Sequence, residues 1–197
     1  IASPSWKAHS MPNTNQGNRG LPAILVSIVG ATALIASPIW ATPGAAAAPQ
    51  SHRVTIALSR AINTSSIAPT KSYASWKYIH VSRSRYRGYL EFSTSGVDLS
   101  KVTKGEVLLT PRSVSGSKRV VVRPVSTTSI VGITKRTAPR VGSKIATSGA
   151  IKAGKRIAIN LASLSAIKAK TVLALNLLNG GKATFYKSGK NAPALRL

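Results

Sequence analysis

The residue types that bind sugars and polyanions are concentrated between residues 73 and 89. Five aromatic side chains occur in this stretch, and lysine and arginine residues are interleaved with them. Flat aromatic rings on a rigid scaffold contact sugar rings, while guanidinium and ammonium groups bind carboxylate or sulfate through charge-assisted hydrogen bonds. The candidate ligand-binding residues are Tyr73, Trp76, Lys77, Tyr78, Arg83, Arg85, Arg87 and Tyr89.

Part of this stretch, YRGYLEFS from Tyr86 onward, has the period-two alternation of a half-buried β-strand. Tyr86 falls on the same side as Leu90 and Phe92, so we expect all three in the core. Tyr89 falls on the opposite side with the neighbouring arginines. The alternation therefore predicts that Tyr89, like Trp76 in the preceding loop, faces solvent.

The charge of the chain points to a polyanionic partner. It has 28 Lys and Arg residues against three Asp and Glu residues, a formal net charge of +25. Of the basic residues, only Lys7 and Arg19 precede residue 51. A field of this sign attracts acidic polysaccharides and nucleic acids, and it disfavours cationic partners.

The groups needed for catalysis are scarce. The three acids are Glu91, Asp98 and Glu106. Glu91 lies on the outward side of its strand, Glu106 begins a strand, and Asp98 sits in a turn-like segment that suits a cap or Asx turn. The chain has three histidines, no cysteine, no GxSxG motif and no glycine-rich phosphate loop. We therefore expect no enzyme, no metal site and no cofactor.

The N-terminal quarter resembles an export signal. Residues 1–20 are polar, and residues 21–40 form an apolar core that is followed by small residues up to Ala47. This arrangement predicts a signal peptide at 21–47, cleaved after Ala47, with the true start at Met11. A membrane-anchoring helix is the alternative, because about 20 apolar residues span a bilayer. We expect 48–53 to be a linker.

From residue 54 onward the pattern is that of short strands separated by Ser, Gly, Pro and Thr clusters. The fold class predicted for 54–197 is all-β, an antiparallel β-sandwich of jelly-roll type, with one short helical turn at 162–170. The predicted strands are 54–59, 78–82, 86–93, 106–114, 119–125, 155–161, 171–178, 183–187 and 192–197. The predicted core residues are Leu90, Phe92, Leu108, Val121, Ile159, Leu173, Leu175 and Phe185.

The order of these segments resembles the DNRLRE-domain family of secreted bacterial and archaeal proteins, which is also described as a carbohydrate-binding module family. The similar segments are APTKSYA at 68–74, RGYLEFS at 87–93, GITKRTAP at 132–139 and NAPAL at 191–195. Acids usual in the family are replaced here, for example by Ser93. The resemblance covers about residues 54–197 and implies a secreted, non-catalytic sugar-binding domain.

Three functions fit the sequence. The favoured one is a secreted carbohydrate-binding module for an acidic polysaccharide or cell-wall glycan. A structural cell-surface, appendage or adhesion domain would use the same sandwich to stack against copies of itself or the cell wall. A nucleic-acid-binding surface would use the same mixture of cations and aromatic rings for phosphates and bases.

Overall fold

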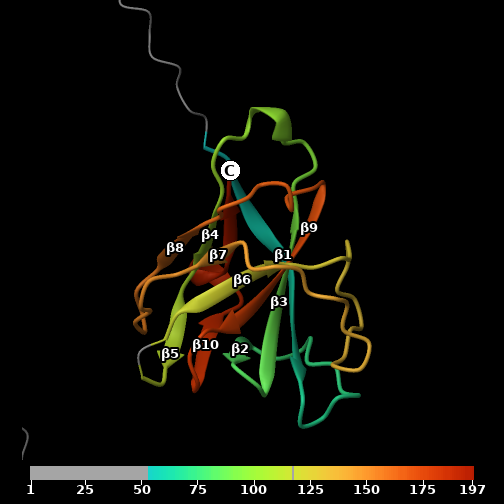
Figure 1. Ribbon diagram of the computed structural model, residues 1–197, viewed down its shortest axis with the longest axis vertical. Coiled ribbons are helices and arrows are strands. Elements are labelled where there is room, and N and C mark those ends of the chain that lie inside the picture. The colour runs from blue at the N-terminus through green and yellow to red at the C-terminus, as the bar shows by residue number, and fades with distance from the viewer. Residues whose placement is uncertain (1–52, 117) are drawn as a thin grey trace, which may run out of the picture. The chain divides into compact units, whose positions relative to one another are not determined.

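The computed structural model describes residues 53–116 and 118–197, which lie in one compact unit, 49–197. The regular secondary structure of the described part is almost entirely β, with two single-turn 3-10 helices (Figure 1). The strands are β1 (Thr55–Ser65), β2 (Tyr78–Ser82), β3 (Tyr86–Ser93), β4 (Glu106–Leu109), β5 (Pro111–Val114), β6 (Val120–Pro124), β7 (Ala146–Thr147), β8 (Ile157–Asn160), β9 (Lys170–Leu177), β10 (Lys182–Tyr186) and β11 (Ala194–Arg196). The helical turns are η1 (Leu99–Lys101) and η2 (Gly189–Asn191).

The strands form two antiparallel sheets. One has eight strands in the order β7-β6-β9-β3-β1-β11-β4-β8, and the other has three in the order β2-β10-β5. The larger sheet curls so that its edge strands approach each other, and Ala162 N–H donates to the Ile145 carbonyl beside them at 2.8 Å. The prediction of an all-β, antiparallel, sandwich-like domain is confirmed.

Most predicted strands occur where the alternation placed them, although the strand predicted at 54–59 extends to Ser65, and one other difference has a local cause. The single strand predicted at 106–114 is divided at Thr110 into β4 and β5, which belong to different sheets. Pro111 has no N–H to donate, so a continuous ladder is interrupted at that residue. No helix occurs at 162–170, where the chain makes only a turn, and the two-residue strand β7 was not predicted.

The main core lies between the two sheets. Six of the eight predicted core residues belong to it: Leu90, Phe92, Ile159, Leu173, Leu175 and Phe185. Leu108 and Val121 are also buried, but their neighbours in sequence occupy the main core instead. The prediction for these two residues is therefore off by one position, because in an all-apolar run such as VVV the alternation does not define a face.

A second, smaller core covers the outward side of the larger sheet. The loop from Val125 to Val141, closed by a bridge between its two ends, places Ile130 and Ile133 over Tyr89. The Ile130 N–H donates to Glu91 Oε2 at 2.9 Å, which fixes the loop to β3. Tyr89 is 0% exposed, so the prediction that it faces solvent is wrong. The alternation identified the outward side correctly but did not reveal that a loop covers it.

The two sheets are held together at one end by Asn63 on β1. Its buried side-chain amide donates to the Tyr78 carbonyl at 3.0 Å and accepts from the His80 N–H at 2.8 Å. The amide therefore occupies the free edge of β2 as a neighbouring strand would. On β3, Gly88 allows β2 to approach, because a Cβ there would lie 2.5 Å from Ile79 Cγ2. Asn63 and the two residues after it, Thr64 and Ser65, are all buried.

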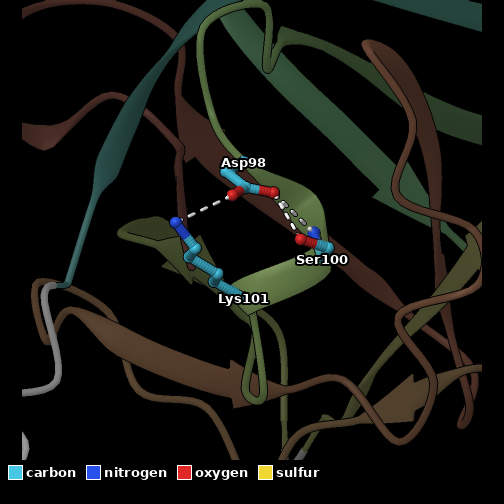
Figure 2. A network of polar contacts seen from close by, with 3 residues as sticks. All are labelled: Asp98, Ser100 and Lys101. Carbon is cyan, nitrogen blue, oxygen red and sulfur yellow. Dashed lines mark hydrogen bonds and ion pairs between the residues drawn. The ribbon is translucent and has the colours of Figure 1, made fainter.

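Asp98 caps η1, as predicted. Its carboxylate accepts from the Ser100 N–H at 3.2 Å and from the Ser100 hydroxyl at 2.6 Å, and it pairs with Lys101 at 3.2 Å (Figure 2). These contacts hold the pKa of Asp98 below its usual value, chiefly through the Ser100 hydroxyl and then through Lys101.

The predictions for the N-terminal quarter lie outside the described residues. They comprise the polar stretch 1–20, the signal peptide 21–47 and all but the last residue of the linker 48–53. Between residues 53 and 197, Ser117 set aside, no helix is long and apolar enough to cross a membrane.

Candidate functional site

The outward side of the smaller sheet carries a cluster of aromatic residues, here called the aromatic face. Ile79 and Phe185 on β2 and β10 point into the main core, so Tyr78, His80 and Tyr186 occupy the opposite side. The loop before β2 adds Tyr73 and Trp76, and the start of β3 adds Tyr86. All six of these rings are half-buried, so each is supported by packing and also reaches the surface.

Trp76 is at the centre of the aromatic face. Its ring centroid lies 4.3 Å from that of Tyr73, 4.6 Å from that of His80 and 5.7 Å from that of Tyr86. Tyr78 and Tyr186 form a separate edge-to-face pair at 6.2 Å. Offset, tilted and edge-to-face pairs of this kind stabilise one another, so the rings form a pre-arranged surface.

Cations surround the aromatic face. The Arg112 guanidinium lies 4.3 Å from the Tyr78 ring centroid, and the Lys182 ammonium lies 5.7 Å from that of Tyr86. Lys77 also lies over Tyr78, at 5.7 Å. These distances are within the range of cation–π attraction. The lysine and arginine head groups are thereby held beside the rings.

Lys187 fixes the loop that carries Trp76. Its ammonium donates to the Ala74 carbonyl and, at 3.3 Å, to the Trp76 carbonyl. Burial lowers the pKa of Lys187. The position of Trp76 therefore depends on a lysine that is more than 100 residues away in the sequence.

The surroundings of His80 favour its neutral form by lowering its pKa. Burial is the main cause of its lowered pKa, and the positive charges of Lys182 and Arg112 lower the pKa further. Its Nδ1 atom is buried and has no hydrogen-bond partner among the described residues. A neutral imidazole packed on Trp76 contributes to the aromatic face as a ring rather than as a cation.

A separate hollow lies on the outward side of the larger sheet, with a volume of about 500 Å³. Its polar lining consists of Arg83, Arg87, Arg123 and Asn176, and we call it the arginine hollow. Its apolar lining comprises Val121, Val141, Leu177 and Leu178. A smaller recess continues from it past Arg83 and Arg87 to Arg85, Tyr86 and Lys135.

The carboxylates of the chain are all engaged elsewhere. Glu106 pairs with Arg196 at 3.1 Å, Asp98 with Lys101, and Glu91 accepts from the Ile130 N–H. Neither site thus has a side-chain carboxylate to neutralise its cations. Over the described ranges, no three His, Cys, Asp or Glu side chains lie close enough together to hold a metal ion.

The structure divides the predicted ligand-binding residues into three groups. Tyr73, Trp76, Lys77 and Tyr78 lie together on the aromatic face, Arg83, Arg85 and Arg87 line the arginine hollow and its recess, and Tyr89 is buried. Tyr86, which we expected in the core, is half-buried and packs on Trp76 instead. It is the first residue of β3, and Lys182 at the start of β10 lies over its ring.

Sequence reasoning missed several residues at both sites. Arg112, Lys182, Tyr186 and Lys187 join the aromatic face, and Arg123 and Asn176 join the hollow. The alternation in ATFYK, around Tyr186, indicates an outward tyrosine. Nothing in the sequence pairs that strand with residues 78–82.

Comparison with known proteins adds no family: no protein-family model matches the chain, and no curated protein matches it significantly.

Proposed function

We propose that this protein is a secreted, non-catalytic carbohydrate-binding module that takes an acidic polysaccharide, such as a cell-wall glycan, on its aromatic face. The same proposal assigns it a jelly-roll sandwich related to the DNRLRE-domain family. The observation that supports it best is the set of rings around Trp76, each half-buried and bordered by cations.

The arrangement suits a sugar chain for three reasons. The rings are held by mutual contacts and by Lys187, so binding orders few side chains. Sugar rings would stack on Trp76 and Tyr73, while carboxylate or sulfate groups would pair with Lys77, Lys182 and Arg112. No side-chain carboxylate competes for these cations, since the three carboxylates of the chain are engaged elsewhere.

The strand edges give less support to a self-assembling appendage domain than to a glycan-binding module. Free edges are the usual route by which sheets join copy to copy. Here the edge of β2 is occupied by the Asn63 amide, and β7 and β8 approach each other. A glycan partner needs no free edge.

The proposal is tested by measuring affinity for neutral and acidic oligosaccharides across a range of salt concentrations. Stacking survives salt, whereas ion pairing is screened, with a Debye length of ~10 Å at 0.1 M. Trp76→Ala should therefore weaken acidic-glycan binding by a similar factor at every salt concentration. Trp76→Phe, which keeps a ring, is the matched control.

The cationic contribution is tested separately. Lys182→Gln and Arg112→Gln should flatten the salt dependence of binding and leave the fold intact, because both side chains are exposed. Single-stranded DNA of matched charge serves as the comparison ligand, since bases also stack on aromatic rings. Equal binding of DNA and the best acidic glycan by every variant would contradict the sugar-binding function and favour a nucleic-acid surface.

A further inference from the structure

The arginine hollow has features that the aromatic face does not explain. It lies on the other sheet, against β3, β9 and β6, and its lining includes no aromatic ring. Three guanidinium groups surround it, from Arg83, Arg87 and Arg123. Like charges gather at one place only at an electrostatic cost, which a bound anion removes.

None of these three arginines has an acidic partner among the residues that the structure describes. The ion pairs of the described residues are Asp98 with Lys101 and Glu106 with Arg196. Arg123 donates to the Gly142 carbonyl at 3.2 Å, which holds its guanidinium at the rim of the hollow. Positive charge in the hollow is therefore uncompensated by any side chain of the described fold.

Three residues with unpartnered polar atoms line the hollow or the recess that continues from it. Thr64 on β1 is paired with Arg87 on β3. Gly88 on β3 is paired with Leu175 on the antiparallel strand β9, so Arg87 lies opposite Asn176. One row across the three strands is therefore formed by Thr64, Arg87 and Asn176. Thr64 Oγ1, Arg87 Nε and Asn176 Oδ1 are each buried without a hydrogen-bond partner among the described residues. Buried polar groups are satisfied in most proteins. The Thr64 hydroxyl and Arg87 Nε can both donate, so the partner that they lack is an acceptor, whereas Asn176 Oδ1 is itself an acceptor and points to no anion.

We propose that the arginine hollow is an anion-binding site that takes a sulfate or phosphate group. Arg87 Nε and the exposed Arg83 guanidinium supply donors of the forked geometry that binds such groups. A volume of about 500 Å³ is within the range of ligand sites and leaves room for the molecule that carries the group. This inference stands apart from the aromatic face, because inorganic anions are enough to test it.

The experiment measures the melting temperature of the full chain in sulfate or phosphate, with chloride adjusted to keep ionic strength constant. An anion that binds only the folded state at ten times its Kd should raise the melting temperature by roughly 3–6 °C. Arg83→Gln and Arg87→Gln should abolish this rise. Arg83 is exposed, so its variant should remain folded, which circular dichroism checks.

The matched control is Arg53→Gln, an exposed arginine outside the hollow, which should keep the full rise. Sulfate also stabilises proteins generally by exclusion from their surface, but that effect would be equal in all variants. An equal rise in all variants, or no rise in the wild type, would overturn the site. A sulfated disaccharide and a short oligonucleotide are then tested as competitors of the bound inorganic anion, which shows whether sulfate or phosphate is the natural group. Displacement of the inorganic anion by either competitor supports the site.

Discussion

At the scale of single residues, His80 connects the packing of the aromatic face to pH. Burial against Trp76, followed by the charges of Lys182 and Arg112, lowers its pKa in the folded state from 6.5. The folded protein therefore disfavours the imidazolium form, whereas the unfolded chain accepts the proton near pH 6.5. The contribution to stability is present above this pH and is lost as pH falls toward the lower folded-state value.

We expect the melting temperature of the wild type to fall between about pH 7.5 and 5.5, and His80→Gln to reduce that fall. The glutamine cannot take up a proton, so this part of the pH dependence disappears. Scanning calorimetry of both proteins over the range is the measurement. A His80→Gln protein that keeps the wild-type pH dependence would show that His80 is not the titrating group.

Residue types predicted the chemical role of individual positions better than they predicted the solvent exposure of those positions. Asp98 caps a turn as its local sequence indicated, because that role depends on neighbours two and three residues away. Tyr89 is buried against expectation, because its cover comes from a loop about 40 residues later. Local roles are encoded locally, whereas exposure depends on segments distant in the sequence.

At the scale of elements, the close approach of β2 to β3 depends on Gly88. A Cβ added there would lie 2.5 Å from Ile79 Cγ2 and 3.3 Å from Val81 Cγ2, and both of these side chains are completely buried. Such neighbours have no free space into which to move. The Asn63 amide, which bridges β1 and β2, depends on the same spacing.

Gly88→Ala should therefore destabilise the domain by about 1–3 kcal/mol, the usual cost of overpacking a filled core. Gly149→Ala is the control, because no atom lies within 4 Å of a Cβ there. It should change the free energy of unfolding by less than about 0.5 kcal/mol. Urea denaturation of the two variants compares them directly. Equal stability of both would mean that β2 can move away from β3 at little cost.

At the scale of the whole molecule, the charge acts against folding. A net charge of +25 repels itself more strongly in the compact state than in the expanded chain. Salt weakens this repulsion, because the Debye length falls from ~30 Å at 0.01 M to ~8 Å at 0.15 M. The protein should consequently be least stable at low ionic strength.

We expect the melting temperature to rise by a few °C, equivalent to ~1 kcal/mol, between 0.01 M and 0.15 M sodium chloride. Chloride is used because it separates general screening from the specific effect of sulfate or phosphate in the arginine hollow. Sorbitol at the same osmolality is the control and should not reproduce the rise. A melting temperature that stays constant or falls with salt would indicate that the charges are already compensated in the folded state.

The sequence alone determined the all-β class, most strand positions and the concentration of rings and cations near residue 80. These properties follow from short-range causes: alternation, turn-forming residues and the lack of carboxylates. The tertiary structure decided that Tyr186 and Arg112 join Tyr78, that Arg123 joins Arg87, and that a loop buries Tyr89. Strand order and register bring these residues together, and both depend on which apolar surfaces pack against each other across long separations in the chain. For that reason one predicted site became two, on different sheets.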